Sequence, residues 1–430
     1  MTGERLGRRR LLAAVGTGLA TGLAGCGYQA AAGDFDWSES IGRYGRSPTV
    51  TWFGDGTHLY GVFERTVGPF GPSDGTVHVY DSSGQRVWSE SPDASRHGDP
   101  AIADGAVFVP LEDGTVVRLE HDGDEQRQTR TDSAAEDGQT AWTTKWYRAD
   151  ERDASDAVPD DGGDDEDQVP ALSLEASDAL VAGAHATAVV AFDATDGDEL
   201  FYLSVEDAVS SATDDESDGQ QVRDLAITNE FVWAALKSQE SDDTLLVGID
   251  ANGSIVADVE LDTSPDWFET LTREDGPLLL LAVDDELRAL DQNGELVYTT
   301  PLESTIRSHD PTIVETDVSS RLYHSSGNSL TAIDLETGER EWHRDDVRFS
   351  ATPAATADGI YGHGTLEATD GRGCNLIGIT ADGDDWWVVD QYEDVDCGDE
   401  LFFVDDRLVA VTDEMLYGFR REPGSRYTVL

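Results

Sequence analysis

Along most of the chain, apolar and polar residues alternate in short runs that end in an acidic residue and a glycine turn. The fullest copy runs from Leu330 to Trp342, with Asp334 at the start of the turn and Gly338 closing it. Alternation with period two is typical of strands, and a short turn with Asp and Gly is typical of a β-hairpin. The pattern therefore predicts a hairpin over residues 330–342.

This hairpin recurs at a nearly constant spacing. The turn residues at positions 250, 291, 334 and 380 are separated by 41, 43 and 46 residues. In five copies an aromatic residue follows four residues after the turn glycine: Trp88, Phe201, Tyr298, Trp342 and Trp387. Aspartates whose carboxylates are expected to cap the turns stand at Asp81, Asp193, Asp250, Asp291 and Asp334.

A second apolar hairpin precedes each copy, as at residues 353–362 and 400–411, so that each unit contains four antiparallel strands. Four-stranded units that repeat every 40 to 50 residues or so are typical of β-propeller blades. Eight such units begin near residues 48, 99, 171, 222, 268, 310, 352 and 400. We therefore expect an all-β propeller of eight four-stranded antiparallel blades, and seven blades plus a degenerate unit is the alternative.

The repeat resembles the pyrroloquinoline-quinone-type propeller repeat, which runs Ala-x-Asp-x-x-x-Gly-x-x-x-Trp. The match is complete from Ala332 to Trp342 and partial elsewhere. In that family the tryptophan packs against the neighbouring blade. The resemblance implies this role for Trp88, Trp342 and Trp387, and we expect Phe201 and Tyr298 to take the same place in their blades.

The N-terminus resembles an export signal. Arg8 and Arg9, a spacer and two leucines resemble the twin-arginine motif, and the apolar segment that follows ends in Leu23-Ala-Gly-Cys26, which resembles a lipobox. Residues 1–26 are therefore expected to be a signal peptide, with Cys26 lipidated and the mature chain on the extracellular face of the cell membrane. A short uncleaved anchor with an incidental cysteine is the alternative.

The predicted domain order places a short tether and the first outer strand at 27–47 and the propeller at 48–430. Asp and Glu number 88 against 29 Lys and Arg, giving a net charge of -59, and the only lysines are Lys145 and Lys237. Such a charge excludes nucleic acid as a partner and is typical of proteins adapted to very high salt, so a halophilic archaeon is the expected source. The 10 Trp, 12 Tyr and 13 Phe argue against an acidic disordered chain.

Candidate catalytic chemistry is sparse. Quinoprotein dehydrogenases, which the repeat resembles, hold their quinone against a disulfide between adjacent cysteines and use a calcium site, whereas Cys374 and Cys397 are not adjacent. Both cysteines are predicted to lie in loops at the same end of one blade, where they could form a disulfide, and two free buried thiols are the alternative. Neither a cofactor nor a metal site is predicted, because the histidines and carboxylates lack ligand spacing.

Insertions between the predicted strands are uneven. Antiparallel alternation predicts that five of them lie on one face of the ring. The longest is an acidic insertion at about 131–170, and the others are 64–75, 204–221, 237–244 and 363–375. A one-sided distribution of loops predicts a binding face. Within the longest insertion, Trp142, Trp146 and Tyr147 are candidate partner contacts, or alternatively an extra strand packed on a blade.

We therefore expect a non-catalytic, monomeric, lipid-anchored surface scaffold that binds an unknown protein partner or surface ligand. It resembles the lipid-anchored propeller subunits of bacterial outer-membrane assembly machines. The alternative is a quinone- or metal-dependent oxidoreductase of the quinoprotein type.

Overall fold

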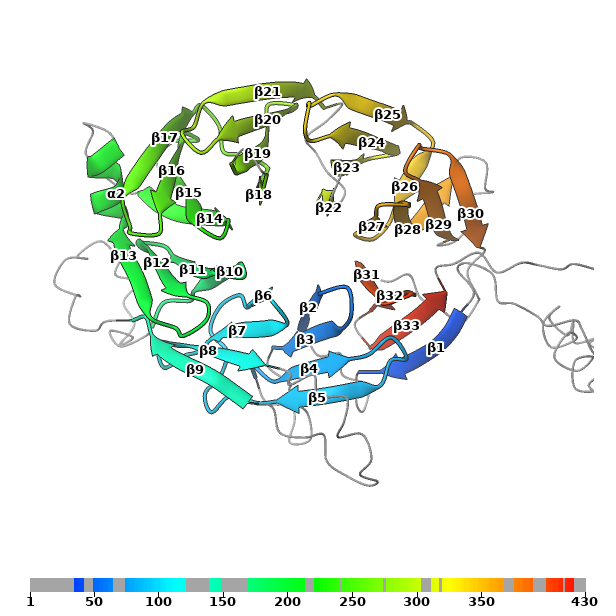
Figure 1. Ribbon diagram of the computed structural model, residues 1–430, viewed down its shortest axis with the longest axis horizontal. Coiled ribbons are helices and arrows are strands. Elements are labelled where there is room, and N and C mark those ends of the chain that lie inside the picture. The colour runs from blue at the N-terminus through cyan, green and yellow to red at the C-terminus, as the bar shows by residue number, and fades with distance from the viewer. Residues whose placement is uncertain are drawn as a thin grey trace, which may run out of the picture.

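The computed structural model describes residues 35–41, 49–64, 74–120, 139–147, 169–212, 220–239, 241–273, 276–302, 311–316, 319–366, 375–389, 400–412 and 414–420. Within them, eight antiparallel sheets follow one another around a common axis as the blades of a closed ring (Figure 1). The predicted all-β propeller is therefore confirmed, with eight blades and not seven. The predicted starts of the eight units lie within five residues of the first strand of each blade.

We label the strands of each blade A to D from the axis outward. Blades 1 and 2 contain β2 (Val50–Gly54), β3 (Leu59–Phe63), β4 (Val77–Tyr80) and β5 (Arg86–Glu90), then β6 (Ala101–Ala103), β7 (Ala106–Pro110), β8 (Thr115–Glu120) and β9 (Gln139–Lys145). Blades 3 and 4 contain β10 (Ser173–Ala176), β11 (Leu180–His185), β12 (Ala188–Asp193) and β13 (Glu199–Ser204), then β14 (Gln220–Ile227), β15 (Phe231–Ser238), β16 (Thr244–Asp250) and β17 (Ile255–Leu261).

Blades 5 and 6 contain β18 (Trp267–Leu271), β19 (Leu278–Val283), β20 (Glu286–Asp291) and β21 (Leu296–Pro301), then β22 (Thr312–Glu315), β23 (Ser320–Ser326), β24 (Ser329–Asp334) and β25 (Arg340–Arg344). In blade 7, β26 (Val347–Phe349) and β27 (Ala354–Thr356) both pair with β28 (Gly359–Leu366), followed by β29 (Asn375–Thr380) and β30 (Asp385–Val389). Blade 8 contains β31 (Glu400–Val404), β32 (Arg407–Val411), β33 (Met415–Arg420) and β1 (Phe35–Ser40).

The ring is closed by strands from opposite parts of the sequence. β1, drawn dark blue in Figure 1, pairs antiparallel with β33, drawn red, and so completes blade 8 as its outer strand. The Asp36 carboxylate accepts from Arg407 Nε at 3.0 Å and from Arg420 Nη2 at 3.2 Å, which ties β1 to the strands beside it. Without β1, blade 8 would have only three of its four strands.

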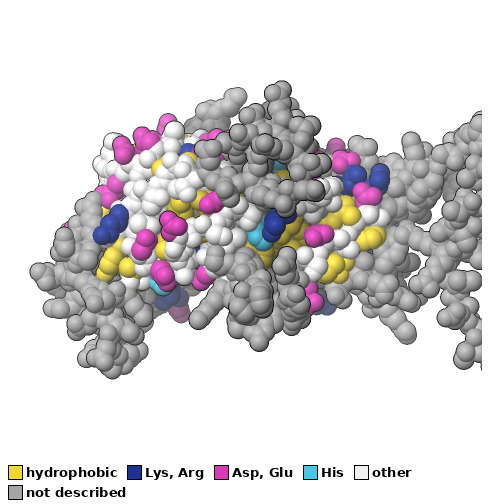
Figure 2. All heavy atoms as spheres, turned by 90° about the horizontal axis from the view of Figure 1, so that it is seen from below, with side chains coloured by type: hydrophobic (Ala, Val, Ile, Leu, Met, Phe, Trp, Pro, Cys, Tyr) yellow, Lys and Arg dark blue, Asp and Glu magenta, His cyan; other side chains and the backbone are white. Residues whose placement is uncertain are grey.

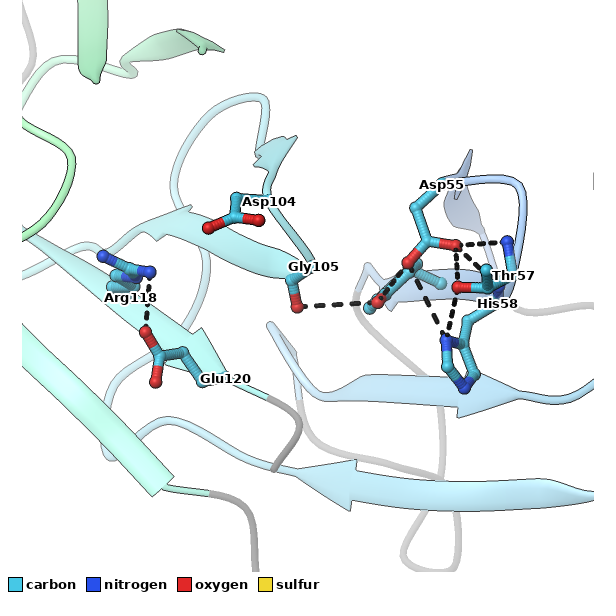
Figure 3. Close-up of a pocket in the computed structure, with 8 residues that line it drawn as sticks. Asp55, Thr57, His58, Asp104, Gly105, Arg118 and Glu120 are labelled. Atoms are coloured by element: carbon cyan, nitrogen blue, oxygen red, sulfur yellow. Dashed lines mark hydrogen bonds and ion pairs between the residues drawn. The ribbon is translucent and has the colours of Figure 1, made fainter. Parts of the chain in front are cut away.

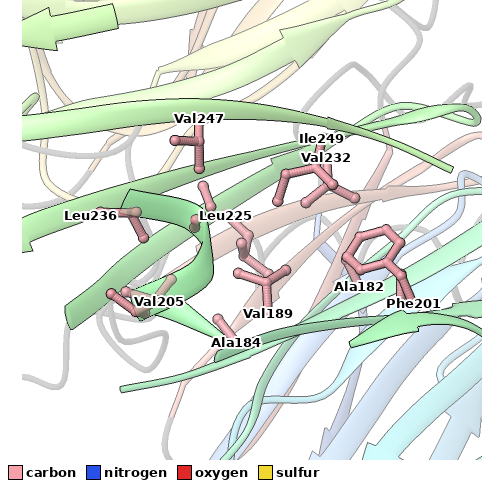
Figure 4. Close-up of a cluster of buried hydrophobic side chains, with 14 of the residues drawn as sticks. Ala182, Ala184, Val189, Phe201, Val205, Leu225, Val232, Leu236, Val247 and Ile249 are labelled. Atoms are coloured by element: carbon pink, nitrogen blue, oxygen red, sulfur yellow. The ribbon is translucent and has the colours of Figure 1, made fainter. Parts of the chain in front are cut away.

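The hydrophobic core lies between the blades. The middle strands are apolar on both faces because each face packs on a neighbouring blade, so that Leu180–His185 and Phe231–Leu236 are buried throughout. In the cluster between blades 3 and 4, Phe201 and Val205 pack with Val232 and Ile249 (Figure 4). The strict alternation expected of half-buried strands is therefore found mainly in the outer strands.

The two ends of each blade define two faces of the ring. Antiparallel alternation puts the A–B and C–D turns on one face, here called the turn face, and the B–C loops and the D–A connections on the other, the connection face. In one D–A connection, the helix α2 (Val205–Ala212) buries Val205, Ala208 and Val209. Its N-terminus is capped by Ser204, whose Oγ accepts from the backbone N–H of Asp207 at 3.0 Å. No helix in the described ranges is long and apolar enough to cross a membrane.

One predicted insertion must be corrected. The sequence predicts residues 131–170 as a single insertion on one face, between two blades, but β9 lies inside that range as the outer strand of blade 2. Residues 121–138 therefore join strands C and D, toward the turn face, and residues 146–172 join blade 2 to blade 3 on the connection face. The other four segments join the strands that were predicted for them, so four of the five insertions, and part of the fifth, belong to the connection face.

Candidate functional site

The five predicted interblade aromatics occupy one register position on their outer strands. Their partners on strand C are Val79, Ala191, Ala289, Ala332 and Gly378. Trp88 is only 4% exposed and belongs to a buried cluster with valines of blade 2. Trp342 Nε1 donates to the carbonyl oxygen of Ala381 in the next blade at 2.7 Å, and Tyr298 OH donates to that of Leu335 at 3.0 Å. These side chains hold adjacent blades together and are not available for catalysis.

Two further tryptophans have the same role: Trp37, which the sequence pattern did not indicate, and Trp142, which is predicted above as a partner contact. Trp37, on β1, donates from Nε1 to the carbonyl oxygen of Ser82 in blade 1 at 2.9 Å. Gly84 allows this contact, because it has φ +78° and a Cβ there would lie 2.4 Å from the Trp37 ring. Trp142, on β9, donates to the carbonyl oxygen of Ala194 in blade 3 at 3.1 Å.

The candidate partner contacts in the long insertion must also be corrected. Trp142 takes the interblade position, and Trp146 is 0% exposed in the core between blades 2 and 3. Tyr147 is half-buried and packs closely on Gly114: a Cβ added to Gly114 would lie only 2.8 Å from the Cβ of Tyr147. The alternative, an extra strand packed on a blade, is also wrong, because β9 is the regular fourth strand of blade 2 and Trp146 and Tyr147 follow it. As packed, Trp146 cannot contact a partner.

The five turn aspartates all accept hydrogen bonds from backbone N–H groups of their own turns. Asp291 Oδ1, for example, accepts from the backbone N–H groups of Asn293 and Glu295, both at 2.9 Å. A backbone N–H group two or three residues further along the turn donates in the same way to each of the other four: Asp81, Asp193, Asp250 and Asp334. These carboxylates stabilise turns, which accounts for them without a metal. Arg8, Arg9, Cys26, Cys374 and Cys397 lie outside the described residues.

A polar pocket of about 650 Å³ opens on the turn face (Figure 3). Its lining comes from turns and strand ends of blades 1 and 2: Asp55, Thr57, His58, Tyr60, Asp104, Gly105, Arg118 and Glu120. Because these residues come from two blades, no single sequence motif could have indicated the pocket.

Asp55 organises the blade 1 side of this pocket. Its carboxylate accepts from Thr57 N at 2.7 Å, from Thr57 Oγ1 at 2.8 Å, from His58 N at 2.6 Å and from Tyr60 OH at 2.7 Å. Burial opposes ionisation, but these bonds and the His58 ring hold the pKa of Asp55 well below its usual range. In turn, the Asp55 carboxylate raises the pKa of His58, against the effect of burial.

The arrangement favours binding over nucleophilic catalysis. Thr57 Oγ1 lies within reach of both His58 Nδ1, at 3.0 Å, and the Asp55 carboxylate, at 2.8 Å. A hydroxyl that donates to a carboxylate is not activated by an imidazole, as a nucleophile would have to be. On the blade 2 side, Arg118 and Glu120 form an ion pair at 2.6 Å, whereas Figure 3 shows Asp104 without a bond to the other lining residues.

Acidic side chains also gather around the axis, on or beside the inner strands of blades 2 to 5. Surrounding protein raises the pKa of Glu175 to about 8, and repulsion from Glu269, Asp224 and Asp99 adds to the effect. The Glu175 side chain is nevertheless exposed to water, and hydration of the carboxylate reduces the part of the pKa shift that comes from the surrounding protein. No group of three or more potential ligands in the described ranges has the geometry of a metal site.

Acidic residues dominate the rest of the surface as well. In the view of Figure 2, Asp and Glu side chains are spread over the described part of the ring wall, with few Lys or Arg among them. This distribution agrees with the net charge of -59, and the described part of that face shows no basic patch.

Comparison with solved structures gives other propellers. The chain is similar to BamB from Moraxella catarrhalis, with 13% identity over 90% of this chain and 99% of that one and a TM-score of 0.49. A computationally designed protein, Ika8, has 14% identity over 87% and 97% and a TM-score of 0.54. The Dos1 propeller has 11% identity over 89% and 94% and a TM-score of 0.52. At such identities these likenesses show the fold alone.

Sequence comparison is more specific. No curated protein sequence matches the chain. The family described as outer membrane protein assembly factor BamB matches two successive stretches, residues 26–240 and 241–394, which together make up most of the chain. The resemblance to the pyrroloquinoline-quinone-type repeat is thereby confirmed. The chain belongs to the BamB family of β-propeller repeat proteins.

Proposed function

We propose that this protein is an exported, lipid-anchored propeller scaffold that binds protein partners or ligands at the outer face of the cell membrane and catalyses no reaction. The observation that carries the proposal is the position of β1. This strand closes the ring and begins at Phe35, nine residues after the predicted lipidation site at Cys26. The family match also begins at residue 26, and the name of that family refers to assembly at a membrane.

The short tether has a consequence for orientation. The eight residues 27–34 can span at most about 28 Å, so a lipid on Cys26 would keep the rim of blade 8 close to the membrane surface. Phe35 pairs with Phe419, near the end of β33 on the turn face. The chain therefore enters the ring from the turn face, and the connection face is free to point away from the membrane.

Replacing Cys26 with serine should release the protein from the membrane. The serine cannot carry the lipid, and no helix in the described ranges could replace it as an anchor. Fractionation of cells into membrane and soluble material, together with electrophoretic mobility, measures the result. Cys374→Ser is the matched control and should stay with the membrane. A Cys26→Ser protein that remains membrane-bound and migrates unchanged would show that the anchor is not there.

Replacing Arg8 and Arg9 together with lysine should stop export. A twin-arginine receptor would recognise the paired guanidinium groups, which lysine cannot reproduce although it keeps the charge. The unprocessed chain should then accumulate inside the cell, as immunoblotting of cell fractions would show. Arg10→Lys, at the spacer position of the motif, is the control and should be exported normally. Normal export of the double variant would contradict the assignment of the signal.

The non-catalytic part of the proposal has its own test. The purified protein, incubated with pyrroloquinoline quinone and Ca²⁺, should show no new absorbance beyond the sum of its components. A stable shifted absorbance that follows the protein through gel filtration would instead favour the quinoprotein alternative.

A further inference from the structure

A small pocket in blade 4 differs in charge from the rest of the molecule. It has a volume of about 320 Å³ and is lined by Arg223, Lys237, Ser238, Gln239, Ser241 and Asp242. Among the described residues that line it, two cationic side chains stand against one carboxylate, whereas the chain as a whole has a net charge of -59. The turn-face pocket, by contrast, has three carboxylates against one arginine and His58.

The two cations come from adjacent strands. Lys237 lies on β15 opposite Gln221 of β14, and Arg223 follows two residues later, at the bulge between Val222 and Asp224. This puts both side chains at the end of blade 4 that belongs to the connection face, beside the segments 204–221 and 237–244 that the sequence singled out. Lys237 is also one of only two lysines in the chain.

Neither cation is fully neutralised by the described residues around it. The Lys237 side chain is 28% exposed, and its Nζ lies 3.2 Å from a carboxylate oxygen of Asp242, whose own side chain is 85% exposed. An ion pair with so exposed a carboxylate is weak and exchanges readily. Arg223 is exposed and has no ion pair or hydrogen bond to another side chain in the described ranges. Because the Arg223 side chain is exposed, an anion can reach its guanidinium group.

We propose that the Arg223–Lys237 pocket receives a carboxylate side chain from an acidic segment of a partner protein. Arginine binds carboxylates through two parallel N–H···O bonds, and the hydroxyl of Ser241 can donate a further hydrogen bond. At 1 M salt, the repulsion between the net charge of -59 and an acidic partner is screened beyond about 3 Å. Under that condition, only direct contacts such as these hydrogen bonds can select the partner. The inference rests on the proposed scaffold function and names the chemistry of the partner.

The two lysines make a direct test possible. Reductive methylation with ¹³C-formaldehyde keeps the charge of lysine and labels only Lys145, Lys237 and the amino terminus. On titration of the full-length protein with hexaglutamate, the Lys237 signal should shift saturably while Lys145 stays in place. Lys237→Arg and Lys145→Arg assign the signals. An unshifted Lys237, or equal shifts at both lysines, would overturn the proposal.

Charge-removing variants give the second readout. Arg223→Gln and Lys237→Gln should each weaken the binding of labelled hexaglutamate about tenfold in fluorescence anisotropy, because each removes a charge-assisted hydrogen bond. Arg348→Gln, an exposed arginine on the inner strand of blade 7, is the matched control and should bind as the parent does. Circular dichroism checks that each variant is folded.

Inorganic phosphate distinguishes a small-anion site from a peptide site. If phosphate displaces hexaglutamate at equal or lower concentration, the pocket is a site for small anions and the proposal is wrong. All these measurements use purified protein and do not depend on export or lipidation. Failure of the pocket therefore leaves the anchor experiments untouched, and a protein that is not membrane-anchored could still show the predicted peptide binding.

Discussion

Replacing Trp37 with alanine should destabilise the protein by about 3 kcal/mol, because a large aromatic side chain in a packed seam is lost together with its hydrogen bond. Trp37 belongs to the strand that completes blade 8, and its indole reaches Ser82 of blade 1. One side chain thus links the outer strand of the last blade to the first. Chemical denaturation at constant high salt measures the loss as a lower midpoint.

Two variants separate this closing role from ordinary burial. Phe35→Ala, on the same strand but 36% exposed, should cost less than about 1 kcal/mol. Trp37→Phe keeps most of the packing and removes the bond to Ser82, so that it should cost about 1 kcal/mol. If Trp37→Ala and Phe35→Ala had equal effects, the closing role assigned to Trp37 would be wrong.

The fold could be predicted from the sequence because one local pattern repeats. Each hairpin has its own turn aspartate, turn glycine and aromatic residue, and these suffice to locate strands C and D in copies such as 330–342. The eight unit starts followed from counting hairpins. A repeat that is complete within about 13 residues needs no knowledge of distant contacts.

The errors lie where a strand is separated from its repeat. Trp142 was taken for a partner contact because 18 residues, 121–138, separate β8 from β9, and the aromatic no longer follows the turn glycine at the usual distance. Trp37 was missed because its blade is almost 400 residues away in the sequence. A signal was present in both cases: the copies at 116–123 and 415–420 have no aromatic residue four positions after the glycine that follows, unlike the five full copies.

The two pockets could not have been predicted from spacing. Asp55 and Glu120 line one pocket only because consecutive blades stand side by side, and Arg223 and Lys237 line another because of the register of β14 and β15. Charge composition did contain one hint. In a chain with two lysines, the position of each lysine is informative, yet only the structure shows that Lys237 has an arginine beside it.

Acid should destabilise the protein through two buried histidines. His363 is 0% exposed and His185 is 8% exposed, and burial lowers the pKa of each to about 4. In the unfolded chain a histidine has a pKa of about 6.5, so between pH 6.5 and 4 the unfolded state binds protons that the folded state does not. Stability therefore falls as the pH decreases through this window, by up to about 3 kcal/mol for each residue.

Replacing His363 with leucine should remove its share of this slope. The free energy of unfolding, measured by denaturant titration from pH 7 to pH 4.5 at constant salt, should fall less steeply with decreasing pH in the variant. Near pH 5, the difference in slope should correspond to the uptake of about one proton fewer on unfolding. Carboxylates that titrate in the same window are common to both proteins, and they cancel in the difference.

His58 provides a control of opposite sign. Its pKa is raised by Asp55, so that the folded state binds the proton more tightly; the stability it contributes is present below pH 6.5 and is lost as the pH rises through the folded pKa. His58→Asn should therefore lose stability relative to the parent protein at low pH, where His363→Leu gains. Parallel pH profiles for the parent and His363→Leu would show that His363 is protonated in the folded state, and the assignment of acid sensitivity to its burial would be wrong.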